Sequence, residues 1–247
     1  MHIDSHLQIG HFHTNFCEDF LLIESPDPSL TLAAIMDGCS MGKDSQFAAA
    51  LFAKMLRKII TVLPYEAMHD PSIPTLDVWS LPALGEEILR RLWQDLRSLK
   101  DRLFLDQLEL LCTLHFALVR PANREVWHVL VGDGMYEIDG ELVEVDQGNR
   151  PDYLAYHLSK GFDSWFANQE LAHFSLQSSF GMASDGIVAF EKMKPGQSFA
   201  TEEVPGFLFQ ANADSSPKYN FRKKLRQLEE EGGLVPTDDL SLIQFAW

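Results

Sequence analysis

The chain of 247 residues is 46% hydrophobic and 23% charged, which is typical of a globular domain large enough to bury a core. Its formal net charge of −16 argues against nucleic acids and anionic membranes as partners, because phosphate groups are bound by clustered Lys and Arg. The three cysteines lack CxxC spacing, and we find neither a signal-peptide pattern nor a run of about 18 apolar residues, so we expect a soluble cytoplasmic protein.

The N-terminal segment alternates polar and apolar residues over 1–10, which predicts a first strand. It also brings four histidines close together in sequence, His2, His6, His11 and His13. No cysteine or HExxH spacing accompanies them, so surface histidines are favoured over a zinc site.

Two further strands are expected at 20–24 and 29–36, separated by a turn that contains Pro and Ser. Five consecutive apolar residues near the end of the second run suit a strand that is buried on both faces. The two runs are close enough in sequence to pair as a hairpin. Such a hairpin would bring Glu18 and Asp19 near Asp37.

Two long helices are predicted next. Apolar residues recur at i, i+4 spacing over 43–63, and Pro64 is expected to end this helix. A loop rich in Pro, Asp and Ser covers 65–82, and a second amphipathic helix is expected over about 84–105. The apolar stripes of both helices indicate core packing rather than a cofactor site.

The second half of the chain is mainly strand-like. Strand patterns occupy 109–119, 125–131, 135–138, 142–145, 174–182 and 240–245, and helices are expected within 187–193 and over 218–231. Asp139-Gly140 predicts a type I′ hairpin between two of the strands. Strand pairs, then two long helices, then more strands predict a single α+β domain over 1–247, with sheets between helix layers.

One segment, 148–173, loses this periodicity and is rich in turn residues. It carries aromatic residues that look exposed, Tyr153, Tyr156, Phe162, Trp165 and Phe166. We interpret it as a loop or short-helix insertion that covers a site.

Acidic residues recur where predicted strands meet turns. The candidate set is Glu18, Asp19, Asp37, Asp133, Asp185 and Asp238, and Gly38 adds a backbone carbonyl. Oxygen ligands of this kind suit Mg²⁺ or Mn²⁺, whereas the same carboxylates without cations would repel one another and take up protons. Asp-Gly is also the commonest turn dipeptide, so any single motif favours a turn over a metal ligand.

The order of these motifs resembles the metal-dependent protein phosphatases of type 2C over nearly the whole chain. The motifs are Cys17-Glu18-Asp19, Met36-Asp37-Gly38, Val131-Gly132-Asp133-Gly134, Ala183-Ser184-Asp185-Gly186 and Asp238-Asp239-Leu240-Ser241. The resemblance implies a four-layer α-β-β-α sandwich, in which two antiparallel sheets are flanked by helices. It also implies two or three Mg²⁺ or Mn²⁺ ions and the hydrolysis of phosphoserine or phosphothreonine on proteins.

The resemblance further implies a role for each acid. Asp37 would bridge the two principal metal ions, and the Gly38 carbonyl would complete one of their shells. Asp185 and Asp238 would hold the first ion, Glu18 with Asp19 the second, and Asp133 with Asp185 a third. Asp37 and Asp185 would serve catalysis by holding the metals whose bridging hydroxide attacks phosphorus directly, and 148–173 would be the variable flap beside the site.

The sequence departs from the family pattern in the residues that bind phosphate. Thr14 stands where the family has an Arg, 39–42 replaces a Gly-Gly stretch, and Gly134-Met135 replaces a Ser-Arg. An Arg binds phosphate through two parallel hydrogen bonds that no neighbour here reproduces. We therefore expect metal binding to be retained and phosphate binding to be altered.

Three functions were weighed against these features. A phosphatase that acts as a monomer on a phosphorylated protein accounts for the retained acids. A pseudophosphatase of the same fold that binds a protein partner accounts for the missing Arg. An amide hydrolase with an N-terminal nucleophile would require processing back to a residue such as Cys17, and ranks last.

Overall fold

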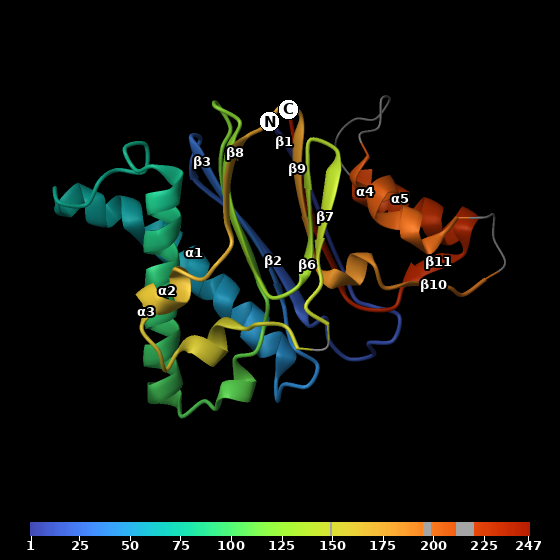
Figure 1. The fold of residues 1–247 in the computed structure, drawn as a ribbon, viewed down its shortest axis with the longest axis horizontal. Coiled ribbons are helices and arrows are strands. Elements are labelled where there is room, and N and C mark those ends of the chain that lie inside the picture. The colour runs from blue at the N-terminus through green and yellow to red at the C-terminus, as the bar shows by residue number, and fades with distance from the viewer. Residues whose placement is uncertain (149, 195–198, 211–219) are drawn as a thin grey trace.

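The structure is a computed structural model and describes residues 1–148, 150–194, 199–210 and 220–247. Two five-stranded antiparallel sheets face each other, and helices cover the outer face of each (Figure 1). This arrangement confirms the expected α+β, four-layer α-β-β-α sandwich.

The two sheets differ in the strands that build them. The first sheet has the order β1 (His2–Gln8), β12 (Leu240–Ala246), β9 (Ser179–Ala183), β6 (Gly134–Ile138) and β7 (Glu141–Val145). The second has the order β2 (Asp19–Asp27), β3 (Leu30–Asp37), β4 (Leu114–Arg120), β5 (Glu125–Val131) and β8 (Leu171–Ser175). A separate pair joins β10 (Phe190–Lys192) to β11 (Leu234–Pro236).

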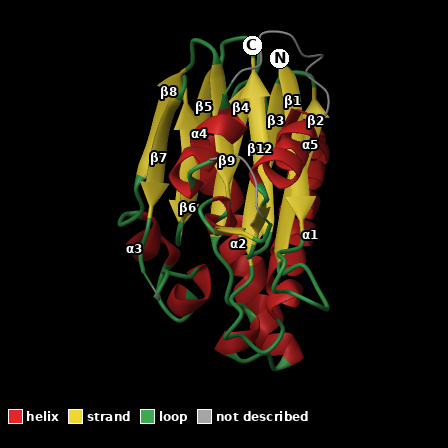
Figure 2. Cartoon of the chain, turned by 90° about the vertical axis from the view of Figure 1, so that its right-hand side faces the viewer, coloured by secondary structure: helices red, strands yellow, loops and turns green. Residues whose placement is uncertain are grey.

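The helices are divided between the two outer faces. The second sheet is covered by α1 (Ser45–His69) and α2 (Leu81–Leu103), and the short α3 (Phe162–Phe166) packs on α2. The first sheet is covered by α4 (Val204–Phe209) and α5 (Asn220–Gln227), which continues as a π-helical turn, Leu228–Gly232 (Figure 2). Short 3-10 turns lie at Gln107–Glu109, Leu154–His157, Asp185–Ile187 and Thr201–Glu203.

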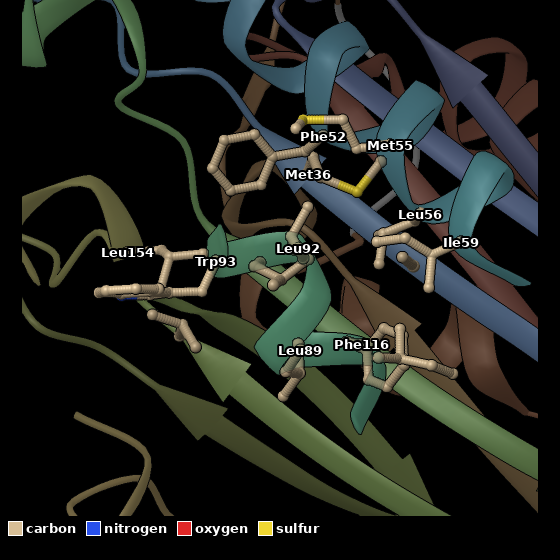
Figure 3. Packing of buried hydrophobic residues seen from close by; sticks show 14 of the residues in the cluster. Met36, Phe52, Met55, Leu56, Ile59, Leu89, Leu92, Trp93, Phe116 and Leu154 are labelled. Carbon is tan, nitrogen blue, oxygen red and sulfur yellow. The ribbon is translucent and has the colours of Figure 1, made fainter. Parts of the chain in front are cut away.

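Buried hydrophobic side chains fill the space between the two sheets and the space between each sheet and the helices that cover it. Strand β3 contributes to two of them: Ala33 and Ile35 face the other sheet, while Met36 packs under α1 and α2 with Phe52 and Leu92 (Figure 3). The apolar run in β3 is therefore buried on both faces, as its sequence predicts.

The boundaries of the long helices differ from the predicted ones. Helix α1 does not end at Pro64 but continues to His69. A proline removes one N–H donor, which leaves the carbonyl of Ile60, four residues earlier, without its helical partner. The helical bonding nevertheless continues past Pro64, and Asp70 N donates to the Glu66 carbonyl at 2.8 Å. Helix α2 begins three residues earlier than predicted, at Leu81, because the Ser80 hydroxyl accepts a hydrogen bond from Ala83 N at 3.4 Å.

Two predicted strands are shortened or divided by hydrogen bonds that hold part of the run out of the sheet. The run at 109–119 becomes a strand only from Leu114, because the preceding residues form a 3-10 turn capped by Asp106. The run at 174–182 is split between β8 and β9, because the Asp139 carboxylate accepts backbone N–H groups from three successive residues, 177–179. Asp139 and Gly140 have φ of 51° and 92°, as a type I′ hairpin requires.

The helix predicted within 187–193 does not form. A 3-10 turn at Asp185–Ile187 leads instead into β10. The Ala189 carbonyl accepts hydrogen bonds from both the backbone N and the hydroxyl of Thr237, at 2.7 and 2.9 Å, and this draws the chain into pairing with β11. Of the helix predicted over 218–231, residues 218 and 219 lie outside the described residues, and the rest is helical as far as Gly232.

The aromatic residues of 148–173 are mostly buried, contrary to expectation. Tyr153, Phe162 and Trp165 belong to the core under α2, whereas Tyr156 is exposed. The Arg90 guanidinium lies 4.2 Å from the centre of the Phe162 ring. The segment is therefore anchored on α2 by its own side chains, and its last residues belong to β8.

Candidate functional site

The β2–β3 hairpin places two acids opposite each other at one end of the sandwich. Asp19 and Asp37 are directly paired in the register of the two strands. Thr113 fixes the backbone of Asp37 on its other side, because its hydroxyl accepts from Asp37 N at 3.1 Å and its N–H donates to the Asp37 carbonyl at 2.8 Å. The predicted approach of Asp19 to Asp37 is confirmed.

The first sheet reaches this hairpin through Ser184, which follows β9. The Ser184 hydroxyl donates to Asp19 Oδ2 at 2.7 Å and accepts from Ser241 N, at the start of β12, at 3.0 Å. Asp185, the next residue, is hydrogen-bonded to Asp37. One serine therefore connects three strands and brings acids from both sheets together.

The acids at this junction cannot all be ionised. Burial raises the pKa of Asp37 well above its usual value, and the charges of Asp19 and Asp185 raise it further. Burial also raises the pKa of Asp19 to about 7, although the hydrogen bond from Ser184 opposes the shift. In the absence of cations the group must therefore retain protons near neutral pH.

Asp133 and Asp185 line a cavity of about 360 Å³ beside this junction, with Glu144 and Asp146 from the end of β7 and the residues after it. Burial, followed by the charge of Asp185, raises the pKa of Asp133 to about 6. Burial and the charge of Asp238 raise the pKa of Asp185. The described lining of this cavity therefore brings several carboxyl groups together.

The donor chemistry of the junction fits a hard divalent cation. Asp19 Oδ1 is buried and accepts no hydrogen bond from the described residues, and carboxylate oxygens are among the ligands that Mg²⁺ and Mn²⁺ prefer. As the side chains lie, however, no three His, Cys, Asp or Glu residues in the described ranges form a group that could hold a metal ion. Binding would therefore require the carboxylates to reorient.

Glu18 and Asp238 are turned toward other partners. Both carboxylate oxygens of Glu18 accept hydrogen bonds at 2.6 Å, from the hydroxyls of Ser40 and Ser45. Asp238, whose side chain is 48% exposed, lies 3.5 Å from His13 Nε2. These two acids flank the junction rather than join its buried centre.

Sequence reasoning missed Asp239. Its carboxylate is buried and accepts N–H groups from Gly10, at 2.7 Å, and from Glu18, and it lies 2.9 Å from His13 Nδ1. It thus ties the segment before β2 to the start of β12. The sequence signal was the pair Asp238-Asp239 before the last strand. The family motif, however, implies a metal-binding role for Asp238 only.

His13 is a basic side chain that lies against two acids beside the junction, Asp238 and Asp239. Burial lowers its pKa, but the hydrogen bond to Asp239 and the charges of Asp239 and Asp238 outweigh this effect and raise it. Among the described residues, no Lys or Arg forms an ion pair with any of the site acids.

Comparison with known proteins agrees with this geometry. A family model described as protein phosphatase 2C matches residues 5–228. A bacterial serine phosphatase has 14% sequence identity and a TM-score of 0.62, with 100% of this chain and 97% of that one covered. RsbX in complex with magnesium has 12% identity and a TM-score of 0.55, with 98% of this chain and 92% of that one covered.

A third similar structure holds the PP2C phosphatase domain of SpoIIE from Bacillus subtilis with a fragment of its regulatory domain. It has 14% identity and a TM-score of 0.56, with 98% of this chain covered. This chain spans 63% of the length of that one. At such identities the similarity shows the fold alone, and no curated protein sequence matches the chain.

Within the described ranges, none of the helices combines the length and apolar character that a membrane span requires. The fold is shared with bacterial phosphatases, and the family model extends from β1 to the π-helical turn after α5. The acids at the junction of the two sheets lie within this matched region, apart from those at the start of β12. The chain therefore belongs to the protein phosphatase 2C family.

Proposed function

We propose that this protein is a Mg²⁺- or Mn²⁺-dependent phosphatase that hydrolyses phosphoserine or phosphothreonine on proteins. The observation that carries the proposal is the junction of Asp19, Asp37 and Asp185, where buried carboxyls retain protons and one oxygen lacks any partner. A stable fold has no need of such a costly cluster, whereas divalent cations would neutralise it. The magnesium complex of RsbX supports the same choice of ion.

The residues that would hold the metals are Glu18, Asp19, Asp37, Gly38 through its carbonyl, Asp133, Asp185 and Asp238. When bound, such ions lower the pKa of water and neutralise charge on the phosphoryl group. Asp37 and Asp185 lie at the centre of this set and are the residues on which we expect catalysis to depend most. Ser184 orients Asp19, and Thr113 holds the backbone of Asp37.

Phosphate recognition in this protein would differ from the family pattern. His13 lies against Asp238 and Asp239 and is the one basic side chain paired with the site acids in the described ranges. A single imidazolium is a weaker anchor for phosphate than a bidentate guanidinium. We therefore expect weak substrate binding, with a high KM, by a monomer that acts on a cytoplasmic phosphoprotein.

Metal-dependent turnover tests the proposal. We expect hydrolysis of p-nitrophenyl phosphate and of a phosphothreonine peptide with Mn²⁺, none with EDTA, and none in Asp37→Ala or Asp185→Ala. Asp101→Ala, which removes an exposed acid of α2, is the matched control and should retain full activity. A folded wild-type protein without Mn²⁺-dependent activity would contradict the proposal.

A pseudophosphatase of the same fold is the second candidate. One observation favours it: Thr14 stands in the place of the family's Arg, which binds phosphate. If the protein binds Mn²⁺ but hydrolyses neither substrate, it is a pseudophosphatase, because the metal site is then intact and the catalytic activity is absent.

A further inference from the structure

Three large apolar side chains are exposed beside the acids that flank the junction. Phe12 is 60% exposed, Phe16 59% and Met41 83%. Phe12 and Phe16 lie in the loop between β1 and β2, residues 9–18, and Met41 lies in the turn after β3. Both segments are at the end of the sandwich opposite the two chain termini (Figure 1). We call these three side chains the apolar rim.

The loop between β1 and β2 is fixed to the start of β12. Phe12 N donates to the Thr237 carbonyl at 3.1 Å, one residue before Asp238. At Gly10 a Cβ atom would lie 2.3 Å from the Asp238 backbone, so glycine permits this close approach. The buried Asp239 carboxylate accepts from Gly10 N at 2.7 Å. Phe12 is therefore exposed beside Asp238 on backbone that is already held in place.

Phe16 and Met41 adjoin the other flanking acid, Glu18. Phe16 stands two residues before it in the chain. Met41 follows Ser40, whose hydroxyl donates to Glu18 Oε2 at 2.6 Å. The turn that carries Met41, residues 39–42, is closed by a hydrogen bond of 2.7 Å between its first and last residues. Exposed apolar side chains thus adjoin both of the acids that flank the junction.

Core packing does not account for these exposed side chains. Within the segment 7–16, four large hydrophobic residues are at least 41% exposed, Leu7, Ile9, Phe12 and Phe16. Single exposed hydrophobic residues are ordinary on a protein surface, whereas several close together mark a surface that binds a partner. The apolar rim is therefore a candidate contact surface.

The position of the rim next to the junction selects its partner. A substrate whose phosphoryl group reaches the junction places its neighbouring residues, which follow at about 3.5 Å along an extended chain, on the surface around it. Thr14 stands where the family has an Arg, so less of the binding free energy comes from the phosphate. Burial of apolar side chains against the rim would supply the remainder.

We propose that the apolar rim binds large apolar side chains that flank the phosphorylated residue of the substrate protein. The inference rests on the proposed phosphatase function, because it takes the junction as the place of the phosphoryl group. It adds a substrate class, phosphoserine or phosphothreonine next to apolar residues. The rim contributes to substrate affinity and leaves the chemical step to the metal centre.

Fluorescence anisotropy in the presence of Mn²⁺ tests the rim through binding alone. The probes are two labelled peptides with a phosphonate analogue of phosphoserine, whose C–P bond resists hydrolysis. One peptide has Leu and Phe on both sides of the phosphonate, and the other has Gly and Ser. We expect wild type to bind the apolar peptide about tenfold more tightly, and the double variant Phe12→Ser, Phe16→Ser to lose most of this difference.

Tyr65→Ser is the matched control for the double variant. Tyr65 is an aromatic residue of similar exposure, 62%. It lies in the same helix as Ser45, but about 30 Å along α1 from the junction end. This variant should keep the wild-type preference for the apolar peptide. All the substituted side chains are exposed, so the variants should fold.

Equal binding of the two peptides to wild type, or a preference that survives in the double variant, would overturn the proposal. Self-association of wild type that the double variant loses, without a peptide preference, would assign the rim to a second copy of this chain and also overturn it. Turnover of p-nitrophenyl phosphate by wild type, measured in parallel, reports on the phosphatase function separately. If turnover is absent and the apolar peptide is still preferred, the proposed reaction fails and the rim is retained as a peptide-binding surface.

Discussion

Strands β6 and β9 have buried carboxylates at both of their ends, and the two ends differ in how those acids are surrounded. At one end Asp185 lies against Asp37, and Asp37 against Asp19 in the opposite sheet. At the other end the buried Glu137 accepts hydrogen bonds from the Ser179 hydroxyl and from Gly140 N, and the amide of Gln244 lies beside it. Crowded carboxylates favour divalent metal ions, whereas a carboxylate with hydrogen-bond donors of its own needs no ion.

The largest expected effect concerns metal-induced stability. Mn²⁺ at 100 times its dissociation constant should stabilise the wild-type protein by about 2.7 kcal/mol. Asp185→Asn should lose most of this stabilisation at the same Mn²⁺ concentration, because it removes a central ligand. Thermal unfolding with and without Mn²⁺ measures the difference. An undiminished shift in Asp185→Asn would place the metal elsewhere.

A second prediction concerns the serine that joins the sheets at the acidic end. Ser184→Ala removes the donor to Asp19 and the acceptor of Ser241 N, both buried, and should lower the free energy of unfolding by about 2 kcal/mol. Ser164→Ala, an exposed change in α3, is the control and should have little effect. Urea unfolding of both variants measures the two values. Equal stabilities would show that Ser184 does not hold the junction together.

A third prediction concerns pH. The folded-state pKa of Asp19 is raised to about 7, so its protonated form stabilises the metal-free protein at low pH, and this contribution is lost as the pH rises through that value. We expect the unfolding free energy of metal-free protein to fall by about 1 kcal/mol per pH unit between roughly pH 5 and 7. Saturating Mn²⁺ should reduce the slope. A flat profile without metal would mean that Asp19 is ionised throughout.

The smallest expected effect is at the other end of the strands. Glu137→Gln should change the unfolding free energy by no more than about 1 kcal/mol at neutral pH, since the amide retains the contacts of Oε1 and removes a buried charge. Its Mn²⁺ affinity should equal that of the wild-type protein. A Mn²⁺ affinity that fell with Glu137→Gln would show that the two ends are coupled.

Features set by neighbouring residues could be predicted from the sequence. The β2–β3 hairpin follows from two apolar runs separated by a short turn, and its register brings Asp19 to Asp37. Asp139-Gly140 likewise specifies its own turn through positive φ. In each case the determining interactions lie within about twenty residues of chain.

Features set by distant contacts could not be predicted. Asp239 is buried because Gly10 and Glu18 donate to it across the fold. Phe162 and Trp165 are buried because α2 lies beneath them, although their segment is rich in turn residues. The periodicity of one segment does not show which distant residues will contact it in the folded chain.

The central claim is that the acids at the junction of the two sheets hold divalent metal ions. Calorimetric titration of the metal-free protein with Mn²⁺, with Asp37→Ala in parallel, tests it most directly. We predict at least two sites in the wild-type protein, and their loss or severe weakening in the variant. A well-folded wild-type protein that binds no Mn²⁺ would contradict the claim, and these acids would then be protonated strand ends and turns.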